Sequence, residues 1–401
     1  MIVLVTTMSA AAGRSRDDVR RNNLATIAGI VHRERQVSRA AITHQTGLSR
    51  SGVATLVGEL EQTGIVTQSV GEERSGVGRP SPVVVPTDRF LAAAVNPDVT
   101  GVRVALVGLG GRVIDQRFCP TDQVPTPREA AAITADALGE LCRSQPHSTV
   151  VGICAAIPGR VDKTGATVRF APHLRWANVD FSALLTENTG LRARVAFDAK
   201  VGLRAETLWG RAQRCRDVVS LYGGPGGIGA AALVDGRLIE GSAGGAARLG
   251  HLLVASDGPP CVCGNIGCLT TMVSHHHLAA ALGLSQVSVA DLRAAVLAET
   301  SPALLSFLDR QVEYLATALR QAVWAYDPEM IMLGGFFEIL LEIGRERLES
   351  ACFASGLGTL REPPTLTTPG LGADQLLVGA ATEAFTPLLD DPSGFTRPQN
   401  V

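Results

Sequence analysis

Three cysteines and one histidine lie close together near the middle of the chain. His251 is followed ten residues later by Cys261-Val-Cys263-Gly-Asn-Ile-Gly-Cys268. Thiolates and a neutral imidazole are the ligands that tetrahedral zinc prefers, and the glycines permit the tight turns that aim three sulfurs at one point. Because four protein ligands close the metal to substrate, the pattern predicts structural zinc rather than catalytic zinc. The alternative is a group of buried free thiols.

Two other stretches carry chemistry. Asp198 is expected between a strand and a helix, where an open α/β sheet binds its ligand. A carboxylate there could accept a proton from a hydroxyl group or could only cap the helix, and the residues alone leave both interpretations open. The glycine run 223–229 could bring backbone N–H groups close to a phosphate, although glycine runs also form ordinary turns.

The elements that must position these residues follow from Phe90 onward. Short apolar runs there alternate with segments of helical period. We expect strands at 91–95, 102–107, 113–118, 150–155, 195–198, 217–221, 230–234, 237–239 and 330–333, and helices at 130–143, 275–282, 288–298 and 302–325. The alternation predicts an α/β fold in two lobes over residues 88–388, followed by a disordered tail at 389–401.

The first 87 residues have a different pattern. An apolar stripe runs at helical spacing from Leu24 to Val31. Ser38 precedes a short second helix, Gly47 supplies a turn, and Ser49 caps a third helix with its own apolar stripe. A helix, a short helix, a turn and a capped helix together predict a helix-turn-helix.

A wing follows this motif. Residues 65–70 are expected to form a strand, 71–78 a flexible tip and 81–86 the returning strand, which gives a winged domain at 18–87. Ten arginines face seven acidic residues in the first 87 positions, a surplus too small to prove nucleic-acid binding by charge alone. A small helical domain used only for dimerisation is the alternative.

The expected DNA contacts come from the start of the third helix and from the wing. The N-terminal residues of a recognition helix face the base edges. Arg50 is able to contact guanine through two hydrogen bonds, and Arg79 at the wing tip is suited to a narrow minor groove. The predicted DNA-binding residues are Ser38, Arg39, Ser49, Arg50, Ser51, Gly52, Thr55 and Arg79.

Composition narrows the class of protein. The chain has 401 residues, of which 46% are hydrophobic and 18% charged, and its net charge is −2, so it is not a polycation. No apolar run reaches the length of a membrane span, and the N-terminus does not resemble a secretory signal. We therefore expect a cytoplasmic protein without a membrane partner, in which disulfides are disfavoured.

Both halves of the chain resemble the ROK family of repressors, open reading frames and sugar kinases, over roughly residues 18–385. The resemblance rests on the cysteine loop with Gly250-His251, on Pro158-Gly159, Asp198-Ala199 and Gly226-Gly227-Ile228-Gly229, and on Asp327-Pro328 through Gly334-Gly335. It implies an N-terminal winged helix-turn-helix followed by an actin-like, two-lobed sugar kinase fold. Family members with a winged helix are typically transcriptional regulators of sugar metabolism, and Ser38-Arg39-Ala40, Gly47-Leu48-Ser49 and Gly78-Arg79-Pro80 are similar to theirs.

One departure from the family concerns catalysis. Kinase members bind ATP phosphates with Asp-x-Gly-Gly-Thr, but the corresponding stretch here is Asn96-Pro97-Asp98-Val99-Thr100. Asparagine replaces the metal-handling aspartate, both glycines are absent, and Asp98 places a negative charge near the phosphate. Because phosphoryl transfer depends on electrostatic stabilisation, we expect no enzyme activity, with Asp198 at the degenerate position of the kinase base.

A second departure concerns the sugar site that the resemblance implies. Phe197, Arg248 and Thr270 replace three polar, mostly acidic residues, whereas Asp198 and His251 are retained. Arg248 favours an anionic ligand such as a sugar phosphate or sugar acid, or else it pairs with Asp198 and no ligand binds. His173 either lines the pocket or lies on a surface loop. The predicted ligand-binding residues are Gly159, His173, Phe197, Asp198, Arg248, His251 and Thr270.

We interpret the chain as a DNA-binding transcriptional regulator, a repressor of sugar metabolism genes, with a kinase-like ligand sensor. Two recognition helices must meet two half-sites of double-stranded DNA, so a homodimer or homotetramer is expected. The first alternative is a ROK sugar kinase that phosphorylates a hexose with ATP and has a regulatory N-terminal domain. The second is a constitutive DNA-binding protein that has lost its ligand.

Overall fold

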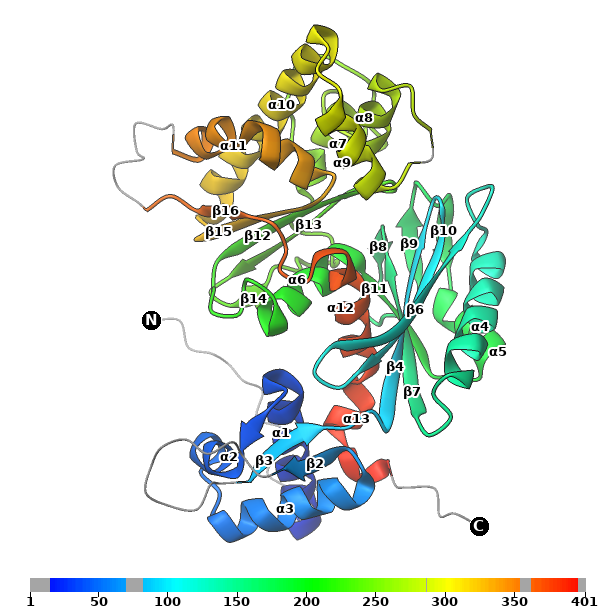
Figure 1. Ribbon diagram of the computed structural model, residues 1–401, viewed down its shortest axis with the longest axis vertical. Helices are drawn as coiled ribbons and strands as arrows, with labels where there is room; N and C mark the ends of the chain where they lie inside the picture. The colour runs from blue at the N-terminus through cyan, green and yellow to red at the C-terminus, as the bar shows by residue number, and fades with distance from the viewer. Residues whose placement is uncertain (1–14, 70–81, 286, 354–361, 396–401) are drawn as a thin grey trace. The chain divides into compact units, whose positions relative to one another are not determined.

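Three helices with capped ends begin the folded chain (Figure 1). The computed structural model describes residues 15–69, 82–285, 287–353 and 362–395. The hydroxyl oxygens of Ser38 and Ser49 each accept a hydrogen bond, at 3.1 Å, from the N–H three residues later, so both predicted N-caps are confirmed. The helices are α1 (Arg16–Glu34), α2 (Arg39–Thr46) and α3 (Arg50–Thr63).

Glycines end the second and third helices. Gly47 and Gly64 have φ of 69° and 82°, a left-handed backbone conformation that other residues adopt only at a cost. The turn after Gly47 leads directly into α3, as expected for a helix-turn-helix. The two apolar stripes that the sequence predicts pack together, and their most buried members are Ile27, Val31, Val53, Val57 and Leu60. Ile42 of α2 is buried as well.

A three-stranded antiparallel sheet completes the winged helix. Its strands are β1 (Val37–Ser38), β2 (Val66–Ser69) and β3 (Val83–Pro86), in the order β1-β3-β2. The strands β2 and β3 are the two predicted strands of the wing, and the predicted tip lies outside the described residues. The two-residue strand β1 was not predicted, because it exists only through its pairing with β3.

The C-terminal segment packs on α1 (Figure 1). It forms α13 (Thr386–Asp390) and the 3-10 helix η4 (Pro392–Gly394). Phe385 and Leu388 are fully buried. The ring of Phe395 meets that of Phe90 edge to face, with 6.1 Å between the ring centroids.

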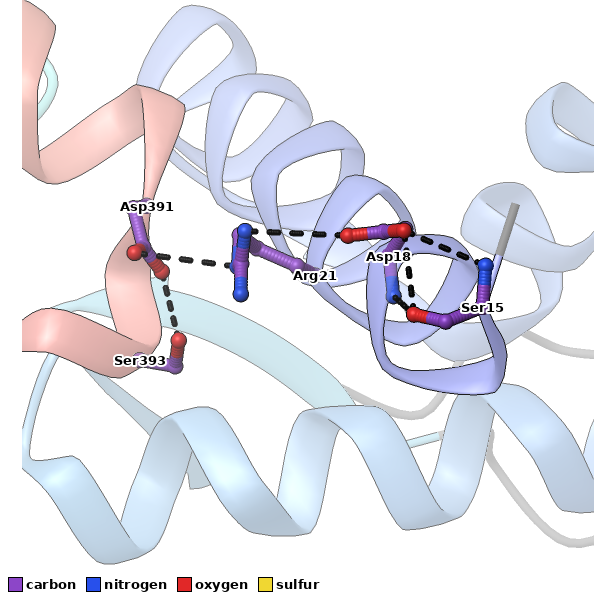
Figure 2. Close-up of polar contacts among 5 residues, drawn as sticks. All are labelled: Ser15, Asp18, Arg21, Asp391 and Ser393. Carbon is purple, nitrogen blue, oxygen red and sulfur yellow. Dashed lines mark hydrogen bonds and ion pairs between the residues drawn. The ribbon is translucent and has the colours of Figure 1, made fainter. Parts of the chain in front are cut away.

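Polar contacts hold the same segment (Figure 2). Arg21 lies 3.7 Å from the carboxylate of Asp391, which also accepts a hydrogen bond from the hydroxyl of Ser393. The sequence predicts a disordered tail at 389–401 because Asp-Pro-Ser-Gly is typical of a loop. The structure differs at 389–395, since contacts with α1 are tertiary and leave no local pattern. Residues 396–401 lie outside the described part of the chain.

A glycine turn also belongs to this N-terminal unit. Arg35 donates a hydrogen bond to the carbonyl of Gly110 at 2.7 Å, and the Gly110 N–H donates to Nδ1 of His32 at 3.0 Å. Among the described residues, the unit comprises 15–69, 82–90, 108–110 and 385–395, and the second unit comprises those within 91–107 and 111–384. The chain therefore passes between the two units four times, at 90/91, 107/108, 110/111 and 384/385.

Two five-stranded sheets form the framework of the second unit (Figure 1). Their strand orders are β11-β7-β4-β5-β6 and β14-β13-β12-β15-β16. The strands β7 and β11 pair in parallel, as do β12 and β15. Parallel pairs with helical connections confirm the two-lobed α/β fold that the alternating pattern predicts.

The strands of these sheets match the predicted ones closely, except for β16, which was not predicted. They are β4 (Phe90–Asp98), β5 (Gly101–Gly108), β6 (Arg112–Pro120), β7 (Thr149–Ile157), β11 (Ala193–Phe197), β12 (Val218–Gly224), β13 (Gly227–Val234), β14 (Arg237–Leu238), β15 (Met330–Gly335) and β16 (Thr365–Thr367). Residues 91–95 of β4 are buried completely, as expected for a strand in the middle of a covered sheet. A small sheet was not predicted: its strands are β8 (Arg160–Val161), β9 (Val168–Ala171) and β10 (Trp176–Val179).

Helices cover the two sheets. They are α4 (Pro127–Arg143), α5 (Phe181–Thr189), α6 (Asp198–Trp209), α7 (Leu269–Met272), α8 (His275–Ala281), α9 (Val289–Ala298), α10 (Pro302–Tyr326), α11 (Phe337–Phe353) and α12 (Gln375–Ala384), with 3-10 turns η1 (Leu249–His251) and η3 (Gly372–Asp374). The helices α4 and α5 pack together beside the first sheet, and α10 and α11 pack together on the second. Within the described ranges, no helix is long and apolar enough to span a membrane.

Candidate functional site

The start of α3 presents polar side chains to solvent. Arg50, Ser51 and Thr55 are exposed on its first turns, and Ser49 caps it. The Arg50 side chain has no hydrogen bond or ion pair to another described residue, so its guanidinium is available to a ligand. The carboxylates nearest in sequence lie a helical turn or more away, beyond Thr55.

The other predicted DNA-contacting residues differ in their surroundings. Ser38 is half-buried and uses its hydroxyl oxygen to cap α2, where Arg39 is the first residue. Gly52 is half-buried within α3 and donates its N–H to Ser49. Arg79 lies outside the described residues. A role in DNA binding stays a prediction for all eight.

The predicted metal ligands meet at one point of the second unit. The ligand atoms of His251, Cys261, Cys263 and Cys268 all lie within 4.8 Å of one another. Nδ1 of His251 is 3.4 Å from Sγ of Cys261, and Sγ of Cys263 is 3.5 Å from Sγ of Cys268. Tetrahedral zinc with ordinary bond lengths separates two sulfurs by about 3.8 Å and a sulfur and a nitrogen by about 3.6 Å. The cluster therefore fits a metal ion.

Backbone geometry brings the last cysteine back to the first. Gly267 has φ of 76°, and a Cβ there would lie 2.1 Å from the carbonyl oxygen of Ala255. Only glycine fits this position, which confirms the need for a tight turn that the sequence indicates. Cys268 then pairs with Leu253 in an isolated β-bridge, two residues after His251.

A small cavity in the second unit collects every predicted ligand-binding residue. The cavity has a volume of about 80 Å³, enough for several water-sized groups such as sugar hydroxyls. Its lining includes Gly159, His173, Phe197, Asp198, Arg248, His251 and Thr270. His173 was expected either to line the pocket or to lie on a surface loop. It is exposed and also lines the cavity. That these residues bind a ligand stays a prediction.

Asp198 faces this cavity from the start of α6. The N-cap position of α6 is Phe197, so Asp198 does not cap the helix in the usual way. One of its oxygens accepts a hydrogen bond from the Ala199 N–H at 2.6 Å. Burial raises the pKa of Asp198 to about 7, and the neighbouring Asp98 carboxylate raises it further while Arg248 lowers it. Near neutral pH, this carboxyl group therefore both donates and accepts protons.

Asp98 lies beside the glycine turn 223–229. Its Oδ1 would lie 2.7 Å from a Cβ placed on Gly226, so the carboxylate presses against the glycine turn. Burial raises the pKa of Asp98 to about 6. The Asn96 amide donates a hydrogen bond to the carbonyl of Ala156 at 2.9 Å and is thus used inside the protein. A phosphate approaching the turn meets a carboxylate instead of a donor.

Arg248 stacks on Phe197 in the same cavity. Its guanidinium carbon lies 4.8 Å from the centroid of the ring. Its Nη2 is buried and has no hydrogen-bond partner among the described residues. The expected alternative, an ion pair between Arg248 and Asp198, is not formed, because the carboxylate acts on Arg248 only through its field.

Sequence reasoning missed several residues of the cavity, of which Tyr222 bears the most on its chemistry. Tyr222 and Leu376 line it as well, from β12 and α12. Burial raises the pKa of the Tyr222 phenol to about 12, so the phenol keeps its proton and can donate a hydrogen bond. Tyr222 directly precedes the glycine run, and that neighbour was the only available signal.

Comparison with known proteins identifies the family to which the chain belongs. A sequence model of the ROK family matches residues 93–384. The chain belongs to the ROK family. A Caldicellulosiruptor bescii protein named xylose repressor is 24% identical over 349 residues, which cover 81% of this chain and 86% of that protein.

Solved structures of other ROK family proteins share the fold. A transcriptional regulator described as a homologue of the Escherichia coli MLC protein aligns with a TM-score of 0.73 and 21% identity, covering 93% of this chain and 97% of its own. A Streptomyces griseus glucokinase in complex with glucose and AMPPNP aligns with a TM-score of 0.62 and 23% identity, covering 73% of this chain and 98% of its own. The fold is therefore common to regulators and kinases of the family, and it does not decide between them.

Proposed function

We propose that this ROK family protein is a transcriptional regulator that represses genes of sugar metabolism. The observation that carries the proposal is the capped start of α3, where Arg50, Ser51 and Thr55 are exposed and Arg50 has no protein partner among the described residues. Such side chains at the N-terminus of a recognition helix are suited to read base edges in the major groove. The relative named xylose repressor supports the proposal, since the match covers most of both chains.

In this proposal, the cavity of the second unit is the site of a carbohydrate effector. A ligand changes DNA affinity only as far as it binds one state of the protein better than the other. Asp198, His173 and Thr270 offer hydrogen-bonding groups to sugar hydroxyls around the cavity. DNA with two half-sites requires two recognition helices, so the active species is a homodimer or homotetramer.

The metal cluster takes a structural zinc ion in this proposal. Zinc would be held by His251, Cys261, Cys263 and Cys268, and when bound it supplies a rigid cross-link rather than chemistry. The ion leaves no coordination site for substrate. His251 also lines the cavity, so the cross-link fixes one of its walls.

The competing proposal is a sugar kinase, which the shared fold of the glucokinase and the retained Asp198 favour. We propose that the chain has no such activity, because Asp98 faces the glycine turn that would bind phosphate. The purified protein is expected to form no ADP from ATP with pentoses, hexoses or amino sugars. Turnover above that of an Asp198→Asn variant would support the kinase instead.

Selection of genomic DNA fragments by the purified full-length protein tests the regulator directly. We expect the protein to enrich a small set of fragments that share a two-fold symmetric sequence, with half-sites separated by whole helical turns. The Gln62→Ala variant, changed at the exposed far end of α3, is expected to enrich the same set, whereas Arg50→Ala is not. Recovery of fragments without any shared sequence would contradict sequence-specific regulation.

A further inference from the structure

The cavity contains a cation whose hydrogen-bonding capacity is not used. Nη2 of Arg248 is buried but has no hydrogen-bond partner among the described residues. Burial lowers the pKa of Arg248 and the charge of Arg160 lowers it further, while Asp198 raises it. An arginine nevertheless stays protonated at neutral pH. The half-buried side chain of Arg248 is therefore charged, has one nitrogen buried without a partner among the residues described, and lies near a second positive charge.

The position of Arg248 is built rather than accidental. The preceding residue, Ala247, has φ of 59°, a left-handed conformation that costs energy for a residue with a Cβ. The guanidinium carbon lies over the aromatic ring of Phe197, 4.8 Å from the ring centroid. Stacking uses the face of a guanidinium and leaves its N–H edge for a planar, bidentate partner.

The two aspartates of the cavity do not supply that partner. Asp198 points one oxygen at the Ala199 N–H, and Asp98 lies against Gly226. Burial raises the pKa of Asp198 to about 7, so this group is only partly ionised at neutral pH, and neither aspartate forms a hydrogen bond with Nη2 of Arg248. They remain suited to hydrogen bonds with hydroxyl groups. The anionic partner of Arg248 must come from a ligand.

We propose that the cavity binds a carbohydrate that carries a carboxylate or phosphate group, and that Arg248 pairs with this group. The inference rests on the proposed function, because it names the ligand class of the same effector site. Asp198 accepts a hydrogen bond from a sugar hydroxyl, and the stacked guanidinium binds two oxygens of the oxyanion. A neutral sugar leaves the buried N–H groups of Arg248 without a partner and therefore binds more weakly.

Calorimetry on the full-length protein tests the ligand class with matched probes. Glucose is the neutral probe, and glucuronate, glucose 6-phosphate and inorganic phosphate are the anionic ones. We expect at least one anionic probe to bind roughly tenfold or more tightly than glucose, as one hydrogen bond to a charged group implies. Glucuronate and glucose 6-phosphate distinguish a sugar acid from a sugar phosphate. Binding of phosphate alone, as tightly as of either sugar, would contradict a carbohydrate ligand.

Variants of Arg248 and Arg160 distinguish a direct contact between Arg248 and the anionic group from a general attraction by positive charge. Arg248→Ala is expected to weaken the best anionic probe roughly ten- to a hundredfold, and Arg248→Lys less, because lysine keeps the charge but loses the bidentate geometry. Arg160→Ala, an exposed change near the same charge, is expected to alter affinity less than about threefold. Circular dichroism checks that each variant is folded.

Three results would overturn the inference: glucose binding more tightly than every anionic probe, no binding by any anionic probe, or equal anion affinity in Arg248→Ala and the wild type. DNA binding measured on the same preparations separates these failures from a failure of the regulator itself. A protein that binds specific DNA but no anion leaves the proposed function standing and removes only the ligand class.

Discussion

At the scale of single residues, the cysteine loop shows how backbone geometry prepares a metal site. Gly267 adopts a conformation that only glycine accepts, and the ligand atoms of four side chains converge within 4.8 Å as a result. Three of these ligands lie in one loop, and the fourth, His251, comes from η1. A metal ion binds such a preformed set with little cost in chain entropy.

Replacing Cys263 by serine is expected to lower metal content and thermal stability together. Serine is a poor zinc ligand, so each chain should lose most of its bound zinc, and the melting temperature should fall by several degrees. Elemental analysis and differential scanning calorimetry measure the two quantities. Cys215→Ser, a half-buried cysteine outside the cluster, is the matched control. Full zinc occupancy with unchanged melting in Cys263→Ser would refute a structural zinc site.

Replacing Asp198 by asparagine is expected to change the pH dependence of stability. The pKa of Asp198 is raised from 3.8 to about 7 by burial, so the folded state binds its proton more tightly than the unfolded state does. The contribution of Asp198 to stability is therefore greatest at low pH and is lost as pH rises from about 4 to about 7. Asparagine does not titrate.

The free energy of unfolding of Asp198→Asn minus that of the wild type should thus increase as pH rises, by up to about 1.4 kcal/mol per pH unit. Urea titrations of ligand-free protein between pH 5 and pH 8 give this difference. Comparison of the two proteins at each pH cancels any metal loss in acid. A difference that is constant with pH would show that Asp198 ionises normally in the folded state.

At the scale of elements, the sequence predicted the helices and strands that local signals determine, but not those that depend on tertiary contacts. The caps Ser38 and Ser49 and the end at Gly47 act within a few residues, so the helices of the winged domain could be read from sequence. The strand β1 depends on pairing with residues more than forty positions away. The strands β8, β9 and β10 pair locally but are only two to four residues long, too short to show a period of two. Contacts with distant residues also explain why the tail was expected to be disordered.

The residues of the cavity likewise fall into those that the sequence could predict and those that it could not. Its residues from the family motifs, such as Asp198 and Arg248, could be proposed from the resemblance alone. Tyr222 and Leu376 could not, because each reaches the cavity through packing of whole elements. The stacking of Arg248 on Phe197 was also hidden, since the two residues are far apart in the sequence and only the fold brings them together.

Shortening Leu388 in α13 tests whether the C-terminal segment is part of the N-terminal unit. Leu388 is fully buried, so Leu388→Ala should lower the free energy of unfolding by about 2–5 kcal/mol. Asp391→Ala breaks an exposed ion pair with Arg21 and should cost less than about 1 kcal/mol. Urea unfolding followed by circular dichroism measures both. An effect of Leu388→Ala no larger than that of Asp391→Ala would contradict the packing of this segment.

At the scale of the whole molecule, the two units are joined by four passages of the chain rather than by a single linker. The turn 108–110 links strands β5 and β6 of the second unit, and the segment from Phe385 continues α12. Both are held by α1, through Gly110 and through Asp391. A rearrangement of the second unit on ligand binding can therefore reach the N-terminal unit along these passages of the chain, and two of the segments contact α1 through hydrogen bonds and an ion pair.

These passages of the chain predict reciprocal coupling between ligand and DNA. If the bound ligand favours one state of the second unit, it changes DNA affinity by the ratio of its affinities for the two states, and DNA changes ligand affinity by the same factor. Calorimetric titration of the ligand with and without operator DNA measures this factor. A ligand whose affinity is the same in both titrations would identify the protein as a constitutive DNA binder.

The most direct test of the account is fluorescence anisotropy with a fragment recovered in the genomic selection and a scrambled fragment of the same length. The wild type should bind the selected fragment far more tightly, and its affinity should fall steeply with salt because phosphate contacts release counterions. Arg50→Ala should lose about 1–3 kcal/mol on the selected fragment but little on the scrambled one. Equal binding of both fragments by the wild type, unaffected by Arg50→Ala, would contradict the claim that this protein reads DNA sequence through α3.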